Sequence, residues 1–146
     1  EMSQALAAMA AGYRLLGADA QAEAMFESAL RWGRLAGSAD GVVDLLCALA
    51  ETASRLAATQ EAEGRGRGRA ARERARDHAF EASQLAAHVA DPRWEVQVLL
   101  RISEVLERCG DRDDALRLQQ RALRIVTEQP APDPRVLRAP RGLADR

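Results

Sequence analysis

The chain contains no lysine and no asparagine, so all 21 of its basic residues are arginine. Aromatic residues make up only 3 % of the 146 residues, glycine and proline are few, and β-branched residues are sparse. Sheets are built largely from β-branched and aromatic residues, so this composition excludes a β-sandwich, a barrel or an α/β sheet. No apolar run approaches the roughly 18 residues of a membrane-spanning helix. We therefore expect an all-α protein with no membrane partner.

Strong charge of one sign is also missing, because the net charge is −1. This balance excludes a general binder of nucleic acids or of membrane surfaces. The two cysteines are too few for a disulfide framework, and no basic stretch followed by an apolar one marks a signal peptide. We expect a cytoplasmic location. Since the chain begins with glutamate and the helical pattern starts at once, we expect a segment of a longer protein.

Alanine, leucine, arginine and glutamate fill more than half of the chain, which is typical of long helices. Gly17 and Gly110 lie where a helix should end and the chain reverse. Asp91 followed by Pro92 predicts a helix start, as does Asp111. The pattern predicts six helices, near 3–16, 20–36, 41–59, 70–90, 93–109 and 112–128.

Small residues recur at fixed spacing, which indicates internal repeats. In the first helices of three units the spacings are 40 and 53 residues, and in the second helices they are 53 and 40. The first-helix positions are Ala10, Ala50 and Ser103, and the second-helix positions are Ala29, Ala82 and Ala122. Both series fit a period of 40 with one insertion of 13 residues inside the second unit. The glycine- and arginine-rich stretch near 58–70 is the predicted insertion.

The units resemble the tetratricopeptide repeat (TPR), a helix-turn-helix repeat with small and bulky residues at fixed places. The matching residues of the first unit are Leu6, Met9, Ala10, Tyr13, Gly17, Ala22, Phe26 and Ala29. Those of the third are Leu99, Ile102, Ser103, Leu106, Gly110, Asp111, Ala115, Ala122 and Leu123, and the weaker second unit has Leu46, Leu49, Ala50, Ala53, Ala75, Ala79 and Ala82. The aromatic places of the later units instead hold Ala53, Ala79, Leu106 and Gln119.

The resemblance implies an α-α superhelix of three repeats over 1–129, with repeats at about 1–40, 41–92 and 93–129. The remaining 130–146 carries four of the five prolines, so we expect an extended tail that serves as a linker or as a ligand of another groove.

In such arrays the first helices line a concave groove that binds a protein or peptide partner. The corresponding positions here are Gln4, Ala7, Ala11, Arg14, Leu15, Asp44, Cys47, Glu51, Ser54, Arg55, Gln97, Leu100, Glu104, Glu107 and Arg108. Their mixed charges suit an arginine-containing or mixed-charge segment, and a solvated face is the alternative. Chaperone-binding repeats use a clamp of lysine and asparagine, which this chain cannot form.

Nothing in the sequence predicts a catalytic residue, a cofactor or a metal site. His78 and His88 are ten residues apart, which on a helix separates them by roughly 80° and about 15 Å, so they cannot share a metal ion. Cys47 and Cys109 are better explained as small packing residues than as nucleophiles. An enzyme is therefore not expected.

The insertion has two interpretations. Arg65, Arg67 and Arg69 could form a basic finger that grips phosphates or an acidic surface. The favoured interpretation is an expansion in an exposed loop, where added length costs little. The stretch lacks the interleaved aromatic residues that would stack on bases, so a nucleic-acid partner is not expected.

The sequence thus predicts a non-catalytic interaction module for a protein or peptide partner. The alternative is a regulatory, sensor or dimerisation segment of a larger bacterial signalling or transcription protein, since Ala90 to Trp94 resembles the arrays attached to such regulators. In that case the partner is a second copy or another domain of the same chain. Nucleic-acid contact through the arginine-rich insertion is the weaker third alternative.

Overall fold

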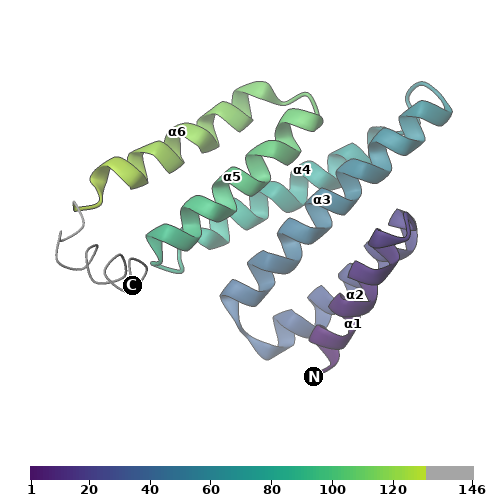
Figure 1. Cartoon of the computed structure of the whole chain (residues 1–146), viewed down its shortest axis with the longest axis horizontal. Coiled ribbons are helices and arrows are strands. Elements are labelled where there is room, and N and C mark those ends of the chain that lie inside the picture. Colours follow the sequence, from purple (N-terminus) through teal and green to yellow (C-terminus); the bar gives the residue numbers. More distant parts are fainter. Residues whose placement is uncertain (131–146) are drawn as a thin grey trace, which may run out of the picture.

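The structure is a computed structural model that describes residues 1–130, and these residues form six α-helices and no strand (Figure 1). The helices are α1 (Met2–Leu15), α2 (Asp19–Ala36), α3 (Ala39–Glu63), α4 (Arg69–Ala86), α5 (Pro92–Arg108) and α6 (Arg112–Glu128). All six predicted helices are confirmed, and the largest differences are at the end of α3 and the end of α4. The expected extended tail, from residue 131 on, lies outside the described residues.

Successive helices pack in pairs: α1 on α2, α3 on α4, and α5 on α6. Further contacts of α2 with α3, of α4 with α5 and of α3 with α5 join one pair to the next, so the pairs stack side by side (Figure 1). This arrangement is compatible with the predicted helical repeats. We call the three pairs the first, second and third unit. The superhelical curvature of the array stays a prediction.

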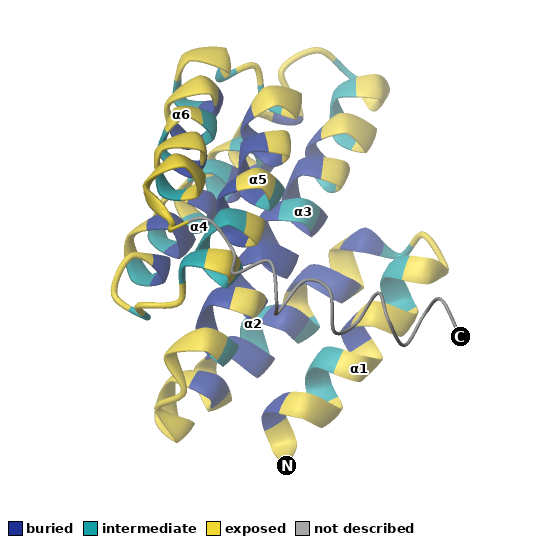
Figure 2. Cartoon of the chain, turned by 60° about the vertical axis from the view of Figure 1, so that its left-hand side comes forward, coloured by how far each residue is buried: buried dark blue, intermediate teal, exposed yellow. Residues whose placement is uncertain are grey.

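The core contains the small residues that set the repeat period. Ala10 and Ala50 are fully buried, and Ser103 is 2 % exposed. The equivalent residues of the second helices are buried as well, at 0–4 % exposure: Ala29, Ala82 and Ala122. Small side chains at these places let paired helices approach closely. The largest fully buried side chains lie in α3 and α5, and Figure 2 shows α3 buried along much of its length.

Glycines and caps end and start the helices largely as expected. Gly17 and Gly110 have φ values of +80° and +85°, a conformation that glycine adopts without strain. The Asp91 carboxylate accepts a hydrogen bond from the backbone N–H of Trp94 at 3.3 Å, so the predicted cap is confirmed. The cap expected at Asp111 is wrong in detail. Asp111 holds the N-cap position of α6 without a capping bond, and its carboxylate pairs with Arg76 at 2.5 Å.

The insertion adds helix more than loop. We expected the first helix of the second unit to end near residue 59, but α3 continues to Glu63 and only residues 64–68 form a turn. The Glu61 carboxylate fixes this turn to α3, because it accepts hydrogen bonds from the backbone N–H groups of Gly66 at 2.8 Å and of Gly68 at 3.3 Å. The backbone of Gly68 packs against α3 so closely that an added Cβ would lie 2.3 Å from the carbonyl oxygen of Ala57.

The arginines of the predicted basic finger, Arg65, Arg67 and Arg69, are all exposed on or beside this turn. They are therefore presented by a short turn that is fastened to α3, not by a long loop. Their use for binding stays a prediction.

Candidate functional site

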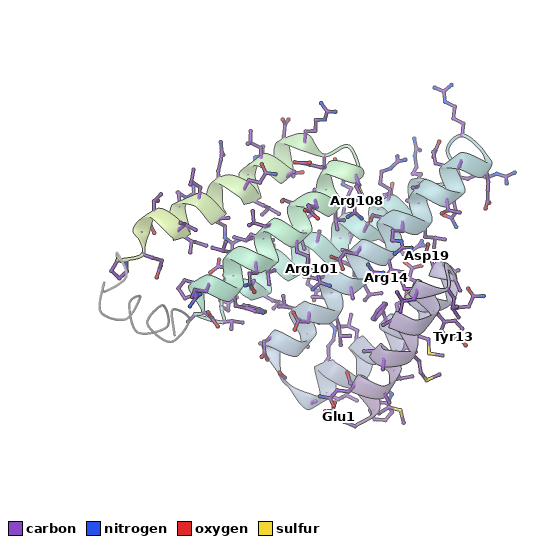
Figure 3. All side chains as sticks on the ribbon, viewed as in Figure 1. Glu1, Tyr13, Arg14, Asp19, Arg101 and Arg108 are labelled. Atoms are coloured by element: carbon purple, nitrogen blue, oxygen red, sulfur yellow. The ribbon has the colours of Figure 1, made fainter. Side chains whose placement is uncertain are left out.

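A row of charged side chains crosses the first helices of the three units. Glu51 of α3 lies at its centre and is 17 % exposed. Arg101 of α5 donates two hydrogen bonds of 2.7 Å to the two carboxylate oxygens of Glu51. Arg14 of α1 lies on the other side, with its guanidinium 3.6 Å from Glu51. One carboxylate thus connects α1, α3 and α5, and Figure 3 places Arg14 and Arg101 together near the middle of the molecule.

The environment shifts the protonation of several groups near this row. The hydrogen bonds that Arg101 donates to Glu51 raise the pKa of Arg101, so this guanidinium stays charged. Asp44, two turns of α3 before Glu51, has a raised pKa because desolvation outweighs the attraction of Arg101. The row is therefore a set of fixed charges, with one carboxyl group beside it that is easier to protonate than a free aspartate.

Most of the groove positions implied by the TPR resemblance are partly or fully exposed on this face. The exposed ones are Gln4, Ala11, Leu15, Asp44, Arg55, Gln97, Leu100, Glu104, Glu107 and Arg108, and the half-buried ones are Ala7, Arg14 and Glu51. Two positions do not fit. Cys47 is fully buried and Ser54 is 5 % exposed, because the middle unit is covered by neighbours on both sides. Cys47 therefore cannot touch a partner.

Arg101 was missed by the sequence reasoning, although it makes the tightest contact of the row. It lies within the apolar stripe of α5, between Leu99 and Ile102, and its repeat equivalents are Ala8 and Ala48. The signal that could have identified Arg101 is a charged residue at a repeat position where the other two units have alanine. Nothing in the spacing alone shows that Glu51 faces it.

A pocket of about 550 Å³ opens where α3, α4 and α5 adjoin, beside the end of the row. Three of the residues that line it are arginines, one from each helix: Arg55, Arg72 and Arg108. Their ion pairs are long: Arg55 with Asp19 at 3.7 Å, Arg72 with Glu61 at 3.6 Å, and Arg108 with Glu104 at 4.0 Å. Arg108 also donates a hydrogen bond of 3.4 Å to the Ser54 hydroxyl.

Elsewhere most arginine pairs are tighter, between 2.5 and 2.9 Å, as in the pairs of Arg34, Arg74, Arg76, Arg101, Arg117 and Arg121. The pocket guanidiniums therefore retain donor capacity for an acidic group.

Burial shifts the pKa of both cysteines and of one histidine. Burial raises the pKa of Cys47 to about 12 and also raises the pKa of the half-buried Cys109. Burial lowers the pKa of His78. His88 was expected on the same helix, but α4 ends at Ala86 and His88 lies in the turn that follows. Within residues 1–130 no three histidine, cysteine or acidic side chains form a group that could hold a metal ion.

The same described residues contain no helix that is long and apolar enough to cross a membrane. No family model matches the chain, and no curated protein matches it either. The similarity to TPR therefore depends on the residues and their spacing alone.

Proposed function

We propose that the chain is a non-catalytic, TPR-like interaction module that binds a protein or peptide partner across the face of α1, α3 and α5. One observation carries the proposal: Glu51, Arg14 and Arg101 form a fixed row of charges across three helices. Exposed side chains from the same helices surround the row. Fixed, already paired charges lose little conformational freedom when a ligand docks beside them.

The chemistry of this face favours a segment of mixed charge with an apolar anchor. Leu100 is 48 % exposed beside the row and offers an apolar contact. Glu104 and Glu107, both exposed, offer carboxylates to a basic side chain of the partner. The loosely paired Arg72 and Arg108 offer guanidiniums to an acidic one. A partner with one acidic residue in the pocket and one aliphatic residue on Leu100 would use both the guanidiniums and the apolar contact.

The proposal is tested by affinity capture from native lysate with chemical crosslinking. The wild-type chain is compared with Leu100→Asp on the face and with Leu35→Asp in α2, which is 80 % exposed away from the face. We expect a partner recovered by the wild type and by Leu35→Asp, and lost with Leu100→Asp. Capture that is equal for all three variants, or no specific capture at all, would count against binding on this face.

A second candidate function is a regulatory or dimerisation segment of a larger bacterial signalling or transcription protein. Large apolar side chains exposed at both ends of the array favour it, among them Leu16 at 83 % and Leu123 at 62 %. The neighbouring gene sequence distinguishes the candidates. A DNA-binding or nucleotide-binding domain in the same chain would favour the regulatory segment, and its absence would favour the independent module.

A further inference from the structure

The outer side of α1 exposes residues whose repeat equivalents are buried. Adding 40 and then 53 to a position in α1 gives the matching positions in α3 and α5. Met9 is 49 % exposed, whereas its equivalents Leu49 and Ile102 are fully buried. The helices that carry Leu49 and Ile102, α3 and α5, pack against the unit before them. The first unit therefore shows an uncovered copy of an interface that the chain already contains.

Neighbouring positions on α1 repeat this pattern. Ala5 is exposed, whereas its equivalents Leu45 and Val98 are 9 % and 3 % exposed. Gly12 is exposed, whereas Thr52 and Val105 are both fully buried. Leu16, two turns after Met9, is 83 % exposed. We call Ala5, Met9, Gly12 and Leu16 the leading face.

The outer side of α6 shows the complementary pattern. Leu123 is 62 % exposed, whereas its equivalents Leu30 and Ser83 are 9 % and 5 % exposed. Val126 is 56 % exposed, although its equivalent in α4, Ala86, is fully buried.

Leu116 is 52 % exposed, whereas its equivalent Glu23 is 6 % exposed. We call Leu116, Leu123 and Val126 the trailing face. In the first two units the places of Leu123 and Val126 are buried, whereas the place of Leu116 holds the buried Glu23 and the half-buried Arg76.

A cavity opens beside the trailing face. In the first unit, α3 narrows the notch between α1 and α2: a Cβ added to Gly33 would lie 3.1 Å from Cδ1 of Leu45, and the pocket that remains there measures about 210 Å³. The equivalent of Gly33 in the third unit is Val126, which lines an open cavity of about 530 Å³ together with Pro92, Val96 and Ile125. Among residues 1–130 no helix follows α6 to pack at this cavity, whereas α3 and α5 pack on the units before them.

We propose that a second copy of this chain covers these surfaces head to tail, with the leading face of one copy packed on the trailing face of the next. The two faces occupy the places that form the junctions between the chain's own units, and a small residue still faces a large one: inside the chain Gly33 meets Leu45, and between copies Val126 would meet Ala5. Met9 and the nearby Met2 have flexible side chains that can adapt to the cavity. Because the two faces are different patches, the contact is heterologous and leaves one face free at each end. This proposal does not depend on partner binding at the α1, α3 and α5 face.

The test uses one variant for each face and sedimentation equilibrium. The wild type should gain mass with concentration between about 1 μM and about 1 mM, the range of weak to moderate affinities. Met9→Glu blocks the leading face and Leu123→Glu blocks the trailing face, so each variant alone should remain monomeric. An equimolar mixture should form a dimer of twice the mass, because each variant keeps the face that the other has lost.

Leu35→Glu is the matched control, since Leu35 and its equivalents His88 and Glu128 are exposed in all three units. It should associate like the wild type. Circular dichroism checks that each variant is folded, and Gly12→Arg replaces Met9→Glu if that variant is not. A wild type that stays monomeric, a mixture that stays monomeric, or a single variant that dimerises alone would overturn the proposal.

Discussion

The guanidinium of Arg101 in α5 forms a two-pronged contact with the carboxylate of Glu51 in α3, with both hydrogen bonds at 2.7 Å. The two residues are 50 positions apart in the chain, and they fasten the third unit to the second. Arg14 approaches the same carboxylate from the first unit at 3.6 Å. Glu51 therefore joins all three units on the face where we propose that a partner binds.

Removal of the Arg101 guanidinium should destabilise the array. Arg101→Met keeps an unbranched apolar stem of similar length to that of arginine, removes the guanidinium, and leaves the 17 % exposed Glu51 with Arg14 alone. Hydrogen bonds to charged groups contribute about 1.5–3 kcal/mol. Because the Arg101 side chain is 38 % exposed, solvent screening reduces the expected loss to about 1–2 kcal/mol. Urea denaturation followed by circular dichroism measures this change in the free energy of unfolding.

The control for this prediction is Arg117→Met. Arg117 pairs with Asp114 at 2.8 Å, but its side chain is 75 % exposed. Exposed pairs contribute about 0–1 kcal/mol, so the loss should lie at the lower end of that range. Equal losses for Arg101→Met and Arg117→Met would show that the central row adds no stability beyond that of a surface pair.

Gly68→Ala should destabilise the junction between α3 and α4. The backbone of Gly68 has φ −83°, which alanine tolerates, so the effect comes from space alone. The new Cβ would lie 2.3 Å from the Ala57 carbonyl oxygen, a rigid backbone atom, and α3 or the turn must move. Overpacking of this kind costs about 1–3 kcal/mol, which thermal denaturation can measure. Gly12→Ala, with nothing within 4 Å of its Cβ, should instead stabilise α1 by up to about 1 kcal/mol.

The helices and the small buried residues between them could be predicted from the sequence, because both depend on the spacing and size of residues along a single helix. Ala10, Ala50 and Ser103 hold the same place in the three repeats, and all three are buried in the structure. The end of α3 was predicted too early, since the glycines received more weight than the helix formers before them. Ala57 to Glu63 contains alanine, glutamine and glutamate, which continue a helix well, and the first glycine is Gly64.

The candidate site was less predictable because it depends on how helices are rotated against one another. Positions carried over from the TPR resemblance assume one orientation for every unit. Leu100 and Cys47 are equivalent in the repeat, but Leu100 is 48 % exposed and Cys47 is fully buried. The middle unit has neighbours on both sides, and a single-unit pattern does not contain this information. The contact between Glu51 and Arg101 depends on the same rotation.

The two thiols should react at very different rates. Cys47 is fully buried with a pKa of about 12, so almost none of it is thiolate at pH 8. Cys109 is only half-buried; its pKa is also raised, and it lines the pocket with Arg72 and Arg108. A disulfide reagent at pH 8 should label one thiol slowly in the native protein and both in denaturant. Cys109→Ser should abolish native labelling, whereas rapid reaction of both native thiols would contradict the burial of Cys47.

Glu61→Gln should open the glycine-rich turn and weaken the fold in a pH-dependent way. Hydrogen bonds from the backbone N–H groups of Gly66 and Gly68 lower the pKa of the Glu61 carboxyl. Its contribution to stability is therefore fully present above the pKa of the unfolded chain, and it is lost as pH falls through the lower folded value. The difference in melting temperature between wild type and Glu61→Gln should shrink from pH 7 to pH 3.

Trypsin gives an independent measure of the same turn. It cleaves after arginine, and both Arg65 and Arg67 lie in the turn that Glu61 holds. Glu61→Gln removes one charged acceptor from two backbone N–H groups, so the turn should open more often and be cut faster at pH 8. Glu63→Gln is the matched control, because Glu63 is exposed two residues away and should leave the cutting rate unchanged. Equal cutting of the two variants would mean that packing of Gly68 against Ala57, and not the Glu61 carboxylate, keeps the turn closed.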